Sequence, residues 1–432
     1  MPPIQDHPLR FKLANELHAR PFPSLKAPCR AVFLAIKKPH DAASRDKSLD
    51  VKHLTDLLDR YGTAHPQPGA THFSDRIGQH VLKWEQHTEF VTYTVFFSGV
   101  TPRVFDPSDF DVFPAEWLAA APGVRITSAL IRVCERVDDD VIGEQIDDWF
   151  VPESLAVSSV IDDEAVIAGD FRIDPAGHLR FAVFPRPHVG ERRIGRIVQR
   201  LCEIETYKIM SMLGFSRVRE LAPRMSEIDS ELSKLMVAMT EGTGPAEDTL
   251  KSLLSVSAEL ESLSAQASFR LGATGAYEAI VGQRIQVLRE ARWRGRQTFA
   301  EFMMRRYDPA MRTVKSSELR LASMANRAMR AGDLLRTRVE VERSAQNQQL
   351  LEGMNQRADM QLRLQHTVEG LSVVAISYYA VSLVSYLLYP LADVVGISKG
   401  LLTALATLPV FATVWLMIRR IHNQIEKQGP ES

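Results

Sequence analysis

A cluster of ionisable side chains near the start of the chain is the first candidate for chemistry. The segment HPLRFKLANELHARPFP contains His7, Arg10, Glu16, His18 and Arg20. Two imidazoles beside charges of both signs could bind an anion or a nucleotide. The alternative is a short helix that caps the domain through Leu9, Leu13 and Leu17, with its polar residues in solvent. No motif with a known mechanism decides between the two.

A run of carboxylates is the second candidate site. The segment VDDDVIGEQIDDW contains Asp138, Asp139, Asp140 and Glu144. Hard cations such as Mg²⁺ bind carboxylate oxygens, so this run is a candidate site for a divalent cation. Acidic residues ahead of a helix also cap its first turn and complement its dipole, which is the alternative interpretation.

No catalytic or cofactor signature accompanies these clusters. The sequence contains no Walker A motif, no G-x-G-x-x-G and no G-x-S-x-G, so we identify no catalytic residue and no cofactor, which favours a non-enzymatic protein over an enzyme. Its three cysteines form no C-x-x-C pair, which favours a reducing compartment. The net charge is −1 without a clustered basic face, so we expect no nucleic-acid partner.

Two kinds of sequence pattern divide the chain before its apolar end. Residues 1–188 alternate short β-branched runs with helical spacing, which predicts an α+β or α/β cytoplasmic domain. Residues 189–370 are almost entirely helical in pattern and predict a helical hairpin followed by a long stalk.

The predicted hairpin depends on two apolar seams separated by a Gly/Pro turn. The seams recur at three- and four-residue steps, as in a coiled coil, through Met225, Ile228, Leu232, Leu235 and Met239, and through Leu253, Val256, Leu260, Leu263 and Ala267. Apolar positions in the stalk are sparse, so it needs neighbours, and we expect a homo-oligomer.

Two uncharged segments near the end of the chain, residues 371–391 and 401–418, predict transmembrane helices. The short connection predicts a tight turn with both ends on one side. Arginines before and after the pair, including those of the basic tail 419–432, place the termini in the cytoplasm by the positive-inside bias. A buried helical pair in a soluble core is the alternative.

One face of the first predicted span carries hydroxyl groups. At 100° per residue they share an arc, which includes Tyr378, Tyr379, Ser382, Ser385, Tyr386 and Tyr389. Hydroxyls in hydrocarbon need partners, so this face should meet protein or water. It could pack helices together, line a water-filled path between subunits, or place tyrosines at the membrane interface.

The chain resembles the bacterial family of uncharacterised membrane-anchored proteins that carry the domain of unknown function 3422. The resemblance rests on HPLRFKLANELHARPFPSL at the start and LQHTVEGLSVVAISYYAVSLVSYLLYPL near the end. It implies a membrane-anchored cytoplasmic protein, without a known activity. The element order is also similar to that of CorA-type magnesium channels, but their Gly-Met-Asn hallmark is absent after the first span.

These observations lead to two main functional hypotheses, and an enzyme whose site uses the N-terminal His, Arg and Glu side chains is the third. The first is a multi-pass protein of the bacterial inner membrane, oligomeric, whose cytoplasmic domain acts as a scaffold or sensor. The alternative is a CorA-like oligomeric cation channel or transporter whose path follows the hydroxyl face. The lipid bilayer is a partner in both hypotheses.

Overall fold

The structure is a computed structural model of the 432-residue chain, and it describes residues 4–11, 13, 22–242 and 244–426. Contacts divide the chain into two compact units, Met1–Gly332 and Asp333–Ser432. The first unit contains the sheet, the helical hairpin and the beginning of the longest helix. The second contains the remainder of that helix and the last one.

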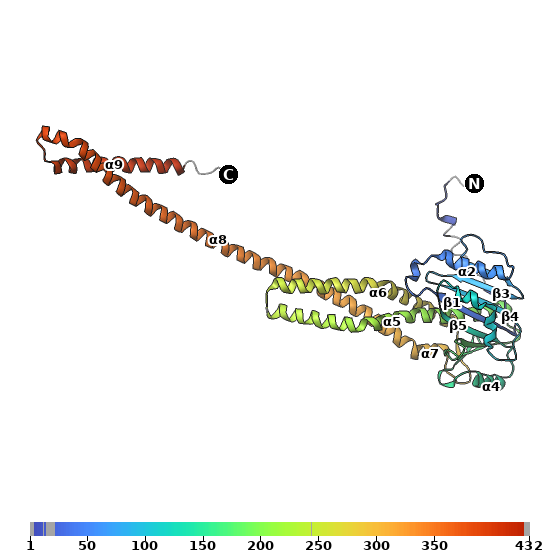
Figure 1. The fold of residues 1–432 in the computed structure, drawn as a ribbon. Coiled ribbons are helices and arrows are strands. Elements are labelled where there is room, and N and C mark those ends of the chain that lie inside the picture. Colours follow the sequence, from blue (N-terminus) through green and yellow to red (C-terminus); the bar gives the residue numbers. More distant parts are fainter. Residues whose placement is uncertain (1–3, 12, 14–21, 243, 427–432) are drawn as a thin grey trace. The chain divides into compact units, whose positions relative to one another are not determined.

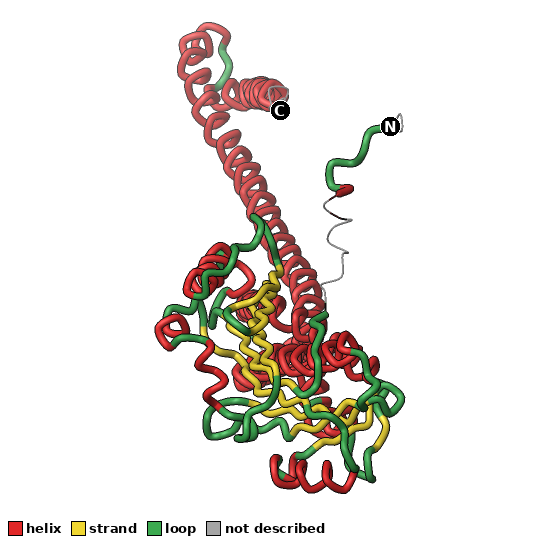
Figure 2. Tube along the Cα trace, turned by 90° about the vertical axis from the view of Figure 1, so that its right-hand side faces the viewer, coloured by secondary structure: helices red, strands yellow, loops and turns green. Residues whose placement is uncertain are grey.

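A nine-stranded sheet organises the first unit and appears as one layer in Figure 2. Its order is β2-β3-β4-β1-β5-β8-β7-β6-β9, and β5 and β8 are the parallel pair in an otherwise antiparallel sheet. The strands are β1 Cys29–Lys37, β2 His72–Ile77, β3 His80–Gln86, β4 Phe90–Ser98, β5 Val124–Val133, β6 Ala156–Val160, β7 Ala165–Gly169, β8 Leu179–Pro185 and β9 Ala291–Arg292.

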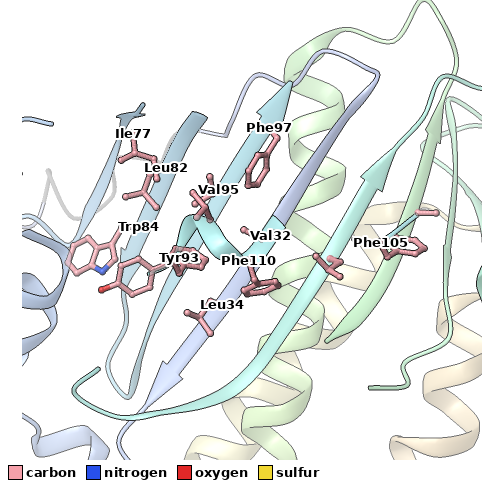
Figure 3. Close-up of a cluster of buried hydrophobic side chains, with 14 of the residues drawn as sticks. Val32, Leu34, Ile77, Leu82, Trp84, Tyr93, Val95, Phe97, Phe105 and Phe110 are labelled. Atoms are coloured by element: carbon pink, nitrogen blue, oxygen red, sulfur yellow. The ribbon is translucent and has the colours of Figure 1, made fainter. Parts of the chain in front are cut away.

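Three helices, α2 Lys47–Arg60, α3 Ala115–Ala119 and α4 Asp139–Trp149, cover one face of this sheet. Period-two alternation along the strands directs large apolar side chains toward them. Figure 3 shows part of the resulting core, which includes Val32, Leu34, Leu82, Trp84, Tyr93, Val95 and Phe97. Short 3₁₀ turns at Ala42–Ser44, Pro107–Val112 and Pro152–Ser154 complete the connections.

Helix α5, Glu191–Glu241, packs on the opposite face of the sheet through its first turns. Its residues Ile194, Ile197, Val198 and Leu201 are buried there. Helix α5 ends at Gly242, whose φ of 68° suits the left-handed conformation that glycine adopts at no steric cost. Helix α6, Ala246–Leu288, begins after Pro245 and returns along α5 (Figure 1).

The predicted seams hold this hairpin together. Met225, Ile228 and Leu232 of α5 are buried, as are Leu253, Val256, Leu260 and Ala267 of α6. Helix α7, Phe299–Arg306, follows and begins with a capping box formed by Thr298 and Glu301. Helix α8, Asp308–Val395, then starts within the first unit, where Arg320 and Arg327 both pair with Asp229 of α5.

The second unit consists of the rest of α8 and α9, Lys399–Glu426. A turn at Gly396, with φ of 75°, separates the two helices, and α9 turns back from the end of α8 at an angle to it (Figures 1 and 2). The structure thus confirms the predicted fold class: an α/β unit, a helical hairpin, a long helix and a terminal pair of apolar helices. The exact domain limits at residues 188 and 370 remain predictions.

Candidate functional site

A cavity of about 390 Å³ lies between the α5-covered face of the sheet and the helices α5 and α6. Strands β1, β3 and β4 provide one wall, and α5 with Arg284 of α6 provides the other. Phe22 and Pro23 lie at its edge, where Leu25 N–H donates to the carbonyl of Glu191 at the start of α5. A cavity of this size suits a small molecule.

A continuous chain of polar contacts lines this cavity. Lys83 lies 3.2 Å from the Glu85 carboxylate, and its ammonium donates to Gln199 Oε1 at 2.6 Å. The Gln199 amide donates from Nε2 to Glu203 Oε1 at 2.8 Å, and Arg284 Nε donates to the other oxygen of Glu203. These contacts fix the orientation of the amide. We call these five residues the polar chain.

The strand geometry explains why Lys83 and Glu85 take part. They are two residues apart on β3, so both point toward α5 while Trp84 between them enters the opposite core. Lys83 is only 6% exposed, and a buried ammonium needs its partners to offset the loss of hydration. Gln199 and Glu203 are one helical turn apart on α5, which places them on one side.

A buried ion pair fixes the edge of the cavity. Glu89, at the tip of the β3–β4 hairpin, is 1% exposed, pairs with Arg270 of α6 and accepts a 2.9 Å hydrogen bond from the Tyr277 hydroxyl. Burial, and then the Glu89 charge, raises the pKa of Tyr277, so this hydroxyl stays a donor. Tyr207 stacks on Tyr277 and lines the cavity. The hairpin tip is therefore tied to α6.

A buried thiol also faces the cavity. Cys202 is 5% exposed, and burial raises its pKa well above the ordinary value. A neutral thiol of this kind packs as a small apolar group and is a poor nucleophile. Thr206, one turn further along α5, donates its hydroxyl to the Cys202 carbonyl at 2.8 Å. The arrangement suits binding rather than covalent chemistry.

The N-terminal cluster is described only in part. His7 Nδ1 accepts from Leu9 N–H at 3.1 Å, and Arg10 forms an exposed ion pair with Asp6. Glu16, His18 and Arg20 lie outside the described residues. The prediction that these five residues form a pocket therefore stays a prediction.

The acidic run lies at the start of α4. Asp138 caps the helix by accepting from the N–H of Asp140 at 2.8 Å. Asp139 pairs with Arg136, and Asp140 pairs with Arg294. Across the part of the chain that the structure describes, no group of three or more His, Cys, Asp or Glu side chains is placed to hold a metal ion. The contacts support helix capping, and a divalent-cation site here stays a prediction.

The hydroxyl face of α8 is divided in the structure. Ser385 is 3% exposed and thus buried within the second unit, whereas Tyr378, Tyr379 and Tyr386 are 70%, 68% and 69% exposed. Ser382 and Tyr389 are half-buried, and the Ser382 hydroxyl donates to the Tyr378 carbonyl at 2.9 Å. The serine and the exposed tyrosines thus lie in different environments.

Two helical segments, within Asp308–Pro390 and Lys399–Arg420, are long and apolar enough to cross a membrane. Only 11% and 6% of their most apolar windows are buried, whereas the core helix of a soluble protein would be mostly buried. This exposure argues against the alternative of a buried helical pair and indicates membrane association.

The polar chain is the part of the site that sequence reasoning missed. The pattern on β3 contained a signal, since Lys83 and Glu85 share one face of a strand whose other face is apolar. No local pattern connects them to their partners, because Gln199 lies 116 residues beyond Lys83, and Arg284 lies 81 residues beyond Glu203.

Fold and site together define a membrane-associated α/β protein with a polar cavity between its sheet and a helical hairpin. The chain belongs to the family described as "Protein of unknown function (DUF3422)", whose model matches residues 5–425. The match confirms the resemblance noted in the sequence. The likeness to CorA-type channels receives no support from this family match. No curated protein matches the chain significantly.

Proposed function

We propose that this protein is a membrane-anchored sensor whose N-terminal unit lies in the cytoplasm and binds a small molecule in the cavity beside the polar chain. The observation that carries the proposal is the cavity itself, about 390 Å³, whose lining combines aromatic side chains with an ordered set of polar and charged groups. Ligand sites generally combine these two features.

The terminal helices serve as the anchor in this proposal. Arg419 and Arg420 follow the second apolar segment, while the connecting turn carries only Lys399 beside Asp393. This asymmetry supports cytoplasmic termini and a turn on the far side of the bacterial inner membrane.

Self-association completes the proposal. Tyr378, Tyr379 and Tyr386 expose hydroxyl groups on α8, and hydrocarbon offers such groups no partner, which favours contact with another copy of the chain. Light scattering in detergent should give a mass of two or more chains, and a monomer at micromolar concentration would contradict this part. Cation flux into liposomes that Tyr386→Phe and Ser382→Leu both reduce would favour the channel alternative.

A thermal-shift screen of the full-length protein in detergent tests the sensor. The panel contains nucleotides, inorganic phosphate, amino acids, carboxylates and divalent cations. We expect at least one class to raise the melting temperature of the wild type, and to raise that of Lys83→Met much less. Lys315→Met, an exposed lysine of α8, is the matched control and should respond like the wild type. If no class of compound raises the melting temperature, the sensor proposal is wrong and a scaffold without a ligand is favoured.

A further inference from the structure

Two threonine hydroxyls of β4 face the cavity without a protein partner. Thr92 and Thr94 both line it, and they are 5% and 8% exposed. Within the described part of the chain, no hydrogen bond joins either hydroxyl to another residue, whereas the Thr206 hydroxyl of the same cavity donates to the Cys202 carbonyl. A buried hydroxyl without a partner costs free energy, which a bound molecule with a hydrogen-bonding group would recover.

The charged residues of the polar chain are matched among themselves. Lys83 lies 3.2 Å from the Glu85 carboxylate, and Arg284 pairs with Glu203. The two cations therefore balance two carboxylates within the wall of the cavity itself. A charged ligand would lose hydration in this partly desolvated space, and the polar chain has no unpaired opposite charge to offset that loss. The polar chain thus favours an uncharged ligand.

The register of the sheet places an aromatic ring beside these hydroxyls. Thr92 and Thr94 lie on the α5-facing side of β4, because Tyr93 between them enters the opposite core (Figure 3). Phe33 of β1 lies directly opposite Thr94, and the Cβ atoms of such a pair are about 5 Å apart. A single ring-sized molecule can therefore contact the Phe33 ring and the Thr94 hydroxyl together.

Apolar side chains complete this part of the cavity. Phe96, two residues beyond Thr94 on β4, is 7% exposed, and Phe33 is 3% exposed. Val198 of α5 lines the other wall. Contact with these side chains removes the surface of an apolar ring from water, which favours its binding.

We infer that the cavity binds an uncharged small molecule with an apolar ring and a hydroxyl group, the class of aromatic alcohols. The ring of the ligand would lie on Phe33 and Phe96, and its hydroxyl would form a hydrogen bond with Thr94 or Thr92. A threonine hydroxyl both donates and accepts, so it suits an alcohol in either role. This inference rests on the proposed sensor function and specifies its ligand class.

Isothermal titration of the full-length protein in detergent tests this inference with three probes that share one ring. 2-Phenylethanol is uncharged, phenylacetate carries a carboxylate, and 2-phenylethylamine carries an ammonium. We expect 2-phenylethanol to bind at least about tenfold more tightly than either charged probe, equivalent to about 1.4 kcal/mol. Titration into protein-free detergent corrects for uptake by the micelles. The comparison uses the wild-type protein alone, so it does not depend on a variant that folds.

Removal of both hydroxyls tests their role. Thr92→Val combined with Thr94→Val keeps the size of the side chains, and valine suits a strand. This double variant should bind 2-phenylethanol about fivefold more weakly, the usual effect of one hydrogen bond. Without ligand it should melt no lower than the wild type, because the two hydroxyls have no protein partner to lose. Thr313→Val, at an exposed threonine of α8, is the matched control and should bind like the wild type.

The outcomes separate this inference from the proposed function. Equal or tighter binding of a charged probe, no binding of 2-phenylethanol, or a double variant that binds normally or melts lower would overturn the assignment of an uncharged alcohol. The three probes also join the thermal-shift panel. If a charged class then shifts the melting temperature of the wild type and shifts that of Lys83→Met much less, the sensor stands with a different ligand. If neither the panel nor 2-phenylethanol shifts it, both proposals are wrong.

Discussion

Two glycines of α5 allow neighbouring segments of the first unit to pack closely against this helix. A Cβ built on Gly195 would lie 1.7 Å from the Pro23 carbonyl oxygen, so only glycine lets the segment at the cavity edge cross the helix. A Cβ on Gly214 would lie 2.1 Å from the Thr274 hydroxyl oxygen and 2.9 Å from its Cβ. Glycine is therefore required at this contact between α5 and α6.

Gly214→Ala tests this second contact. The added methyl has no space and should lower the free energy of unfolding by about 1–3 kcal/mol, the usual cost of overpacking. Gly272→Ala on α6 is the matched control, because its Cβ would meet nothing within 4 Å. It should stabilise the helix by up to about 1 kcal/mol. Thermal unfolding by circular dichroism measures both, and equal effects of the two would contradict the packing.

His178 gives the stability of the first unit a pH dependence. Its ring stacks on Phe110 at 3.8 Å, and its Nδ1 lies 2.9 Å from the Ser128 hydroxyl. Burial, and then the Arg125 charge, lowers its pKa from 6.5 to about 4, while Asp174 opposes this shift. Below pH 6.5 the unfolded chain therefore binds a proton that the folded chain does not, and stability falls as the pH falls toward 4.

Removal of the imidazole tests this dependence. Between pH 6.5 and pH 5, the wild type should lose about 1.6 kcal/mol more stability than His178→Gln. Burial raises the pKa of Glu290 to about 6, with the opposite sign, but that group is present in both proteins and cancels. His72→Gln, at an exposed histidine, should keep the wild-type slope. Parallel curves for wild type and His178→Gln would refute this account.

At the scale of elements, the contacts between α5 and α6 determine how stable the helical hairpin is. Its apolar seam is buried along both helices, and Arg224 of α5 forms two hydrogen bonds with the Glu259 carboxylate of α6. The ion pair is partly exposed to solvent, and such pairs contribute at most about 1 kcal/mol. The apolar seam must therefore supply most of the hairpin's stability.

Truncation of the seam tests this balance. Leu260→Ala removes a side chain that is fully buried and should cost about 2–5 kcal/mol. Leu254→Ala removes a side chain of the same helix that is 59% exposed and should cost less than about 0.5 kcal/mol. Denaturant unfolding followed by circular dichroism gives both values. Similar losses at the two positions would mean that the seam does not face α5.

The sequence predicts these elements better than it predicts the site. Leu232 in α5 and Leu260 in α6 each belong to an apolar series with helical spacing, and such a series can be recognised within a single segment of the sequence. The polar chain could not be predicted from a local pattern, because its residues come from β3, α5 and α6 and meet only through tertiary packing. The pairing of β9 with β6 was missed for a different reason, because Ala291 and Arg292 are too short a run to show a strand period.

At the scale of the whole molecule, the chain combines a ligand-sized cavity in one unit with an apolar helical pair in the other. The apolar pair was predictable, because a bilayer sets the length of an uncharged helix directly. Few residues of these two apolar segments are buried in the structure, which agrees with a lipid environment. Membrane anchorage with a cytoplasmic N-terminal unit is the central claim, since the proposed sensor depends on it.

Cysteine labelling in intact bacterial cells tests that claim most directly. Cys29 and Cys202 are buried, and burial raises the pKa of these two thiols and of Cys134, so the native background should be low. A membrane-impermeant maleimide should label Lys399→Cys in intact cells, because the proposed topology places the turn outside the inner membrane. It should label Glu261→Cys, at an exposed position of α6, only after the cells are lysed. Labelling of Glu261→Cys in intact cells, or of Lys399→Cys only after lysis, would contradict the account.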